Sequence, residues 1–84
     1  MIAIAIYSRP GCHLCEEMKA VVQTVVRREN ASVTIDEIDI STDPALESRY
    51  GLEIPVLMVD GKKAAKYRVT EDAVTRMLAA RTSE

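Results

Sequence analysis

An apolar strand, a proline-glycine break and an amphipathic helix follow one another at the start of this chain, and this order constrains the fold strongly. A strand is predicted over Ile2–Tyr7, where isoleucine recurs, and we expect burial on both of its faces. Pro10-Gly11 interrupts it, and from Leu14 the apolar residues recur at helical spacing. A second strand is predicted over Val33–Ile40. Strand, helix and strand in this order imply a right-handed parallel crossover.

The second predicted strand has an interruption in its pattern. Its apolar residues are Val33, Ile35, Ile38 and Ile40. Between the second and third of them the alternation slips by one residue, at Asp36-Glu37. We expect a backbone irregularity at that point.

Two further helices are predicted in the second half. The first begins at Asp43-Pro44, a capping carboxylate followed by proline at the first helical position, and it stops at Gly51. The second is capped by Thr70. Its packed face consists of Val74, Met77 and Leu78.

A hairpin is predicted between these helices. The segments Val56–Val59 and Lys62–Tyr67 flank Asp60-Gly61, a strong signal for a tight turn. The complete predicted order is β-α-β-α-β-β-α, with an antiparallel second half.

Composition bounds the class of protein. The 84 residues make one small domain, predicted over 1–84, and 48% of them are hydrophobic, which argues against disorder. The net charge is −2 and no Lys/Arg run exceeds two residues, so no nucleic-acid partner is expected. No apolar run approaches the roughly 20 residues of a membrane helix, and Met1–Ile6 is too short for a signal-peptide core. We expect a cytoplasmic monomer that does not bind membranes.

The only cysteines, Cys12 and Cys15, stand where the first helix begins. Residues i and i+3 of a helix are neighbours, so the two sulfurs can pass between dithiol and disulfide with little backbone movement. The unpaired N–H groups and the dipole of a helix N-terminus favour the thiolate, which is the reactive form. We expect Cys12 to be the exposed nucleophile and Cys15 the resolving thiol. Cys15 should point inward on the apolar stripe of Met18, Val22 and Val25.

Other uses of the same thiols stay open. Tetrahedral zinc needs four ligands, and His13, the only histidine, is adjacent to Cys12 and poorly placed to complete a site. We therefore expect no metal site on a single chain. A dimer that shares an iron–sulfur cluster is one alternative. A binding module whose disulfide switches a partner surface is another. His13 would favour the Cys12 thiolate when cationic, or is simply solvated, whereas Glu16 and Glu17 oppose the thiolate.

Two segments carry a resemblance to a known family. Tyr7–Cys15, which reads YSRPGC-x-x-C, is similar to the active-site segment of glutaredoxins. Arg49–Val56, which reads RYGLEIPV, resembles the segment that leads to their cis-proline. The resemblance spans nearly the whole chain. It implies an α/β fold of thioredoxin-like, glutaredoxin type, with a four-stranded mixed sheet flanked by helices, and thiol–disulfide oxidoreductase activity.

The resemblance also implies a substrate-binding set around the cysteines. Pro55 corresponds to the cis-proline that faces the sulfurs and leaves the backbone N–H and C=O of Ile54 free to pair with an extended substrate. Arg9 stands where the family places a basic residue for a carboxylate of glutathione. Pro10 and His13, on either side of Gly11-Cys12, complete the predicted set.

The electron donor stays open. Glutaredoxins carry a Gly-Gly pair after the last strand that helps to hold glutathione, but the corresponding region here, Ala64–Asp72, contains no glycine. We expect protein or low-molecular-weight disulfides as substrates and no bound cofactor. Either glutathione, as a co-substrate, or a disulfide reductase would supply the electrons.

Overall fold

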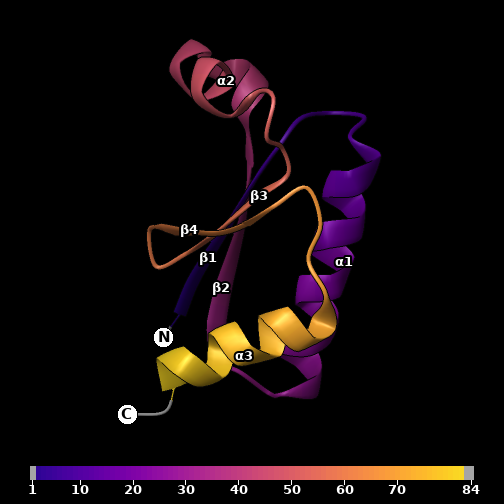
Figure 1. Ribbon diagram of the computed structural model, residues 1–84, viewed down its shortest axis with the longest axis vertical. Helices are drawn as coiled ribbons and strands as arrows, with labels where there is room; N and C mark the ends of the chain where they lie inside the picture. Colours follow the sequence, from indigo (N-terminus) through magenta and orange to yellow (C-terminus); the bar gives the residue numbers. More distant parts are fainter. Residues whose placement is uncertain (1, 83–84) are drawn as a thin grey trace.

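Strands and helices follow one another in the predicted order. The computed structural model describes residues 2–82, so the first residue and the last two of the predicted domain lie outside the described part. The elements are β1 (Ile2–Ser8), α1 (His13–Arg28), β2 (Val33–Asp39), the 3₁₀ turn η1 (Ile40–Thr42), α2 (Pro44–Tyr50), β3 (Val56–Val59), β4 (Lys62–Lys66) and α3 (Glu71–Thr82) (Figure 1). Within residues 2–82, no helix is long and apolar enough to cross a bilayer.

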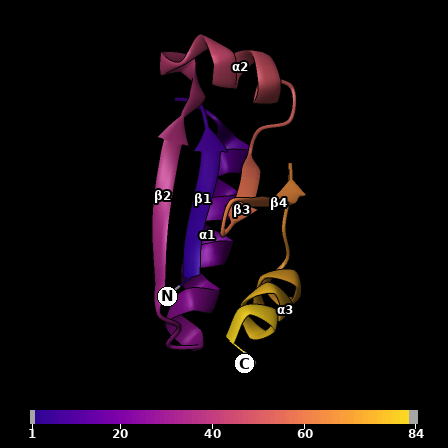
Figure 2. The same ribbon diagram turned by 90° about the vertical axis from the view of Figure 1, so that its left-hand side faces the viewer.

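β1 joins the two halves of the chain in one sheet. The strand order is β2-β1-β3-β4, with β1 parallel to β2 and antiparallel to β3 (Figure 2). The predicted parallel pairing of the first two strands is confirmed. β3 and β4 are antiparallel, as predicted for the hairpin. The two pairings of β1 place the N-terminus of α1 and the segment before β3 at the same end of the sheet.

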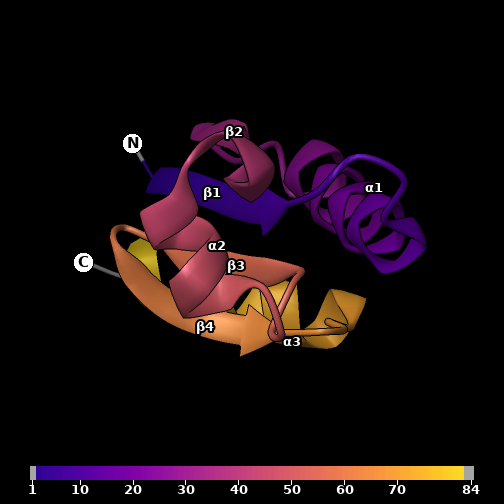
Figure 3. The same ribbon diagram turned by 90° about the horizontal axis from the view of Figure 1, so that it is seen from above.

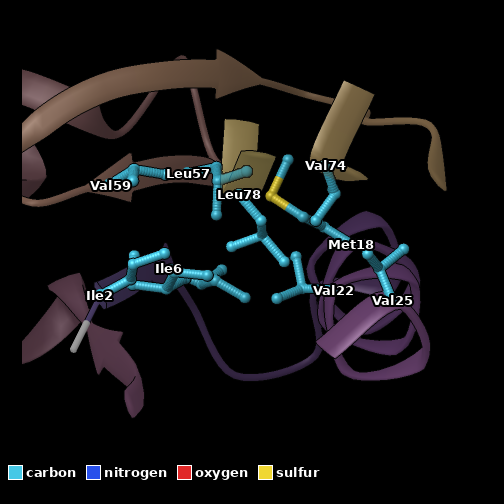
Figure 4. Close-up of a cluster of buried hydrophobic side chains, with 10 residues drawn as sticks. Ile2, Ile6, Met18, Val22, Val25, Leu57, Val59, Val74 and Leu78 are labelled. Carbon is cyan, nitrogen blue, oxygen red and sulfur yellow. The ribbon is translucent and has the colours of Figure 1, made fainter. Parts of the chain in front are cut away.

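The main core lies between the sheet and the helices α1 and α3, which pack on one of its faces (Figures 1 and 2). Burial of each large aliphatic side chain contributes about 1.5–3 kcal/mol of transfer free energy. The predicted packed face of α3 is confirmed, because Val74 and Leu78 are buried in this cluster and Met77 packs against it. The buried members of the cluster are Ile2, Ile4, Ile6, Met18, Val22, Val25, Leu57, Val59, Val74 and Leu78 (Figure 4).

The prediction that β1 is buried on both faces is wrong. Burial alternates along the strand, with Ile2, Ile4 and Ile6 on the core side, whereas Ala3 is exposed and Tyr7 half-buried on the other side. The reason is the size of α2. This helix has only seven residues and lies across one end of the sheet (Figure 2). There Tyr50 stacks on Tyr7, with ring centroids 4.7 Å apart.

The irregularity predicted at Asp36-Glu37 is also wrong. β2 pairs with β1 without a register shift along its whole length. The slip in the sequence pattern instead marks the point at which the apolar residues of β2 move from one face of the sheet to the other. Val33 and Ile35 pack against the main core, whereas Glu37, on the same face, pairs with Lys19 of α1 across 3.4 Å. A register shift occurs in the hairpin, where Leu57 faces Ala65 but Met58 faces Lys63. The sequence pattern gave no sign of that bulge.

The predicted ends of α2 and the predicted start of α3 are confirmed. The Asp43 carboxylate accepts the Ala45 N–H at 2.9 Å, and the Thr70 hydroxyl accepts the Ala73 N–H at 3.1 Å. Gly51 follows α2, where a Cβ atom would lie 2.5 Å from the carbonyl oxygen of Glu47. Glycine is therefore needed there for close approach rather than for a left-handed backbone, because its φ is −55°.

The predicted turn at Asp60-Gly61 is confirmed and has a second function in the fold. Both residues adopt positive φ, 49° and 83°, as a tight hairpin requires. The Asp60 carboxylate accepts the N–H of Ala3 at 2.9 Å, and the Asp60 N–H donates to the carbonyl of Ala3 at 2.7 Å. The turn is thereby bonded to the beginning of β1.

Replacement of Asp60 tests this contact. Asp60→Ala removes the acceptor for Ala3 and the side chain that tolerates the left-handed backbone, so we expect a loss of about 1–2 kcal/mol of unfolding free energy in urea titrations. Asp60→Asn keeps both properties and is the matched control, expected within about 0.5 kcal/mol of the parent. Equal stability of Asp60→Ala and Asp60→Asn would contradict this account.

Candidate active site

Cys12 caps the N-terminus of α1. Gly11 adopts a φ of 79° before it, and the Cys12 N–H donates to the carbonyl of Arg9 at 3.1 Å, which closes the turn after β1. Cys12 itself is extended, and its Sγ accepts the backbone N–H of Cys15 at 3.1 Å. The prediction that Cys12 is exposed needs correction, because Cys12 is half-buried in this disulfide form.

Cys15 lies in the first turn of α1 and is buried, with 1% of its surface exposed. Its predicted place on the inward stripe is confirmed, since Met18, Val22 and Val25 are buried on the same helix. Cys12 and Cys15 form a disulfide across a Cα–Cα distance of 5.2 Å. That distance lies inside the normal range for disulfides, so the bond can form between these backbone positions.

The surroundings of the Cys12 sulfur favour negative charge. The Cys15 N–H that it accepts is one of the unpaired donors of a helix N-terminus, and the dipole of the helix adds a partial positive charge at the same place. Both stabilise a thiolate after reduction. The arrangement therefore combines an outer sulfur, in surroundings that favour a thiolate, with a buried second sulfur to which it is bonded.

Pro55 follows a cis peptide bond, as the resemblance implied. Because Tyr7 of β1 pairs with Val56 of β3, Pro55 lies beside the end of β1, from which the Cys12 turn departs. Figure 3 views this end of the sheet, with the turn into α1 and the segment leading to β3 both in sight. Within the described chain, the backbone N–H and C=O of Ile54 form no hydrogen bond.

Arg9 is engaged by α2. Its Nη2 atom lies 2.9 Å from Oε1 of Glu47, whereas its Nε–H is buried and lacks a hydrogen-bond partner among the described residues. Asp39 lies near it at the end of β2. The pKa of the Asp39 carboxyl is held below its usual range, chiefly by hydrogen bonds from the Ser41 hydroxyl and N–H, with the Arg9 charge adding to them.

The remaining predicted site residues are on the surface. Pro10 and His13 are exposed on either side of Gly11-Cys12, and Glu16 and Glu17 are exposed on α1 directly after Cys15. Among residues 2–82, no three His, Cys, Asp or Glu side chains converge closely enough to hold a metal ion.

Hollows flank the first turns of α1. One, of about 170 Å³, lies against Arg9 and carries the acidic side chains of Glu37 and Asp39. Another, of about 220 Å³, lies between α1 and the segment that follows β4, and its lining includes Leu14 and Tyr67. Their linings include Gly11 and Leu14, the neighbours of the two cysteines, but neither cysteine itself.

Tyr67 is a residue of this region to which sequence reasoning assigned no role. It follows β4 with a φ of 68°, and its hydroxyl donates to the carbonyl of Leu52 at 2.9 Å. Its N–H donates to the carbonyl of Pro55 at 2.8 Å. The position of Tyr67 in the sequence could have pointed to a role, because this bulky residue stands in the region where glutaredoxins carry two glycines.

Comparison with known proteins gives the family. The family model "Glutaredoxin-like domain (DUF836)" matches residues 3–79. The chain belongs to this glutaredoxin-like family. It is also similar to the glutaredoxin-like protein YDR286C homolog of Dictyostelium discoideum, with 33% identity over 75 residues, 84% of this chain and 69% of that protein.

Solved structures agree on the fold of this glutaredoxin-like chain. The protein XcR50 from X. campestris is 28% identical, with a TM-score of 0.72 over 92% of this chain and 96% of that one. Ne2328 from Nitrosomonas europaea is 28% identical, with a TM-score of 0.77 over 92% and 91%. Chloroplastic thioredoxin z, at 12% identity, has a TM-score of 0.78 over 100% and 80%, and shows the fold alone. The predicted thioredoxin-like fold is confirmed.

The difference in burial between the two sulfurs predicts selective alkylation of the reduced glutaredoxin-like chain. Limiting iodoacetamide should modify Cys12 and leave Cys15 unmodified, as mapped by peptide mass spectrometry. The rate should reach half its maximum below the pH of about 8.5 that is usual for a free thiol, because the helix N-terminus favours the thiolate. In the Cys12→Ser control, Cys15 should react only after unfolding in urea. Faster alkylation of Cys15 than of Cys12 would contradict this order.

Proposed function

We propose that this chain is a thiol–disulfide oxidoreductase that cycles Cys12 and Cys15 between dithiol and disulfide. The observation that carries the proposal is the contact of the Cys12 sulfur with the Cys15 N–H at the start of α1, with Cys15 buried beneath it. A disulfide that only stabilised the fold would close a longer loop, because stabilisation grows with loop length and this loop spans a separation of three residues.

The reduced chain would react in two exchange steps. The Cys12 thiolate attacks one sulfur of the substrate disulfide, forms a mixed disulfide and releases the other sulfur as a thiolate. The Cys15 thiolate then attacks Cys12 Sγ, forms the Cys12–Cys15 disulfide and releases the second substrate thiolate. The substrate gains two electrons and takes up two protons as its thiolates are protonated. The chain loses two electrons and is reduced again by its donor.

Ile54 would align the substrate. Its backbone N–H and C=O lack partners within the described chain and belong to the segment before β3, so an extended substrate strand can pair with them. Pro55, which fixes the backbone beside it, is part of the same binding edge. Pro10 and His13 are exposed next to Cys12, where they would contact the substrate.

Arg9 has a different part in this proposal. Its guanidinium is shared with Glu47, so a substrate carboxylate would compete with that pair rather than meet a free cation. Protein and low-molecular-weight disulfides are both accepted as substrates in this scheme, and glutathione or a disulfide reductase supplies the electrons. We place the activity in the cytoplasm, where a lone cysteine pair is usually catalytic rather than structural. We also propose that the chain acts as a monomer, without nucleic-acid or membrane partners.

Trapping of the mixed disulfide tests the assignment of the two thiols. Cys15→Ser removes the resolving thiol, so incubation with a peptide disulfide should accumulate a covalent adduct on Cys12, visible by non-reducing electrophoresis and mass spectrometry. Cys12→Ser is the matched control, with the same change at the other sulfur, and should form no adduct. Disulfide reduction that survives in Cys12→Ser would show that the nucleophile is assigned wrongly.

A further inference from the structure

Tyr67 connects the end of β4 to the segment that precedes β3. Its backbone N–H donates to the carbonyl of Pro55 at 2.8 Å, and its side-chain hydroxyl donates to the carbonyl of Leu52 at 2.9 Å. One residue therefore bonds both ends of the segment 52–55. Ile54, whose backbone N–H and C=O have no partner within the described chain, lies between the two attachment points.

The backbone of Tyr67 is strained. Its φ of 68° is rarely adopted by a bulky residue, because the Cβ atom crowds the backbone in the left-handed region. The following residue closes the turn tightly, with the Arg68 N–H donating to the carbonyl of Lys66 at 2.8 Å across Tyr67. This is the hydrogen-bond pattern of the γ-turn with positive φ, which is rare and strained. Such conformations persist only where surrounding contacts hold them.

Other contacts hold the same segment, but none of them bonds the backbone of Ile54. Glu53 forms an ion pair with Lys63 of β4, and the Lys63 ammonium holds the pKa of the Glu53 carboxyl below its usual range. The Glu53 N–H donates to the carbonyl of Tyr50 at the end of α2. The segment is thus fastened to α2, to β4 and to Tyr67.

We propose that Tyr67 is a positioning residue, whose hydroxyl holds segment 52–55 in the shape in which Ile54 presents its backbone N–H and C=O to an extended polypeptide disulfide. This inference rests on the oxidoreductase function proposed above and narrows its preferred substrate to polypeptides. A small disulfide can reach the Cys12 sulfur without pairing with Ile54, so its reaction does not depend on the hydroxyl. A polypeptide gains binding energy from a preorganised edge and loses part of it when that edge is free to move.

Removal of the single hydroxyl tests the proposal. The prereduced full chain is mixed with an excess of a short synthetic peptide that contains an intramolecular disulfide, quenched with N-ethylmaleimide and analysed by mass spectrometry. In Tyr67→Phe we expect the half-saturating peptide concentration to rise about fivefold with the limiting rate unchanged, as for loss of one hydrogen bond. With hydroxyethyl disulfide, the rate constant should equal that of the parent.

Two further variants show whether the effect of Tyr67→Phe comes from the loss of this particular hydrogen bond. Thr24→Val is the matched control, because it removes a hydroxyl that donates to a backbone carbonyl, that of Ala20, far along α1 from the site. It should leave both reactions unchanged. Tyr67→Gly also loses the tether but accepts the positive φ without strain, so it should fold, as checked by circular dichroism, and reproduce the rise seen with Tyr67→Phe.

The outcomes separate this inference from the proposed function. An unchanged half-saturating concentration for the peptide in Tyr67→Phe and Tyr67→Gly overturns the positioning role while leaving the oxidoreductase function intact. An equal loss with the peptide and with hydroxyethyl disulfide also overturns it, because Tyr67 would then support the whole site. A parent chain that reduces neither disulfide removes the proposed function, and the inference with it.

Discussion

The antiparallel pairing of β1 with β3 is the interaction on which the candidate site depends. Because Tyr7 lies opposite Val56, the peptide that leaves β1 and the peptide that enters β3 meet at one end of the sheet. The first carries Cys12 to the start of α1, and the second carries the cis-proline. The parallel pairing of β1 with β2 places α1 on one face, so Cys15 is covered by the core while Cys12 stays at its edge. The register of β1 against β3 therefore brings the two halves of the candidate site together, although they are far apart in the sequence.

Local chemistry explains which parts of the fold could be predicted. The cap at Asp43, the turn at Asp60-Gly61 and the inward stripe of α1 each depend on a few neighbouring residues, and the structure confirms them. The exposure of Ala3 depends on what covers the far face of the sheet, which is decided by the length and place of α2. The apolar pattern of β2 led to a wrong prediction of a backbone irregularity, because a strand can change its apolar face without a change of register.

The candidate site, like the fold, could be predicted from the sequence only in part. The positions of Cys12 and Cys15 follow from their place at a helix N-terminus, but the cis bond before Pro55 came only from the family resemblance, since a typical X-Pro bond is trans. The partner of Arg9 is a glutamate on α2, separated from it by 38 residues, and no pattern in the sequence connects the two. The sequence pattern likewise did not predict that Cys12 is half-buried.

Tyr67 shows why one part of the candidate site could not be predicted from the sequence. Propensity places a glycine or an asparagine at a positive φ, so a tyrosine there contradicts local preference and is expected only where something else compensates. The compensation is a hydroxyl bond to Leu52 that a glycine cannot make. Glutaredoxins carry a glycine pair in this region, whereas this chain carries a bulky residue that is hydrogen-bonded to both ends of segment 52–55. The proposed positioning role of Tyr67 would favour polypeptide disulfides, which can pair with Ile54, over small disulfides, which need no such pairing.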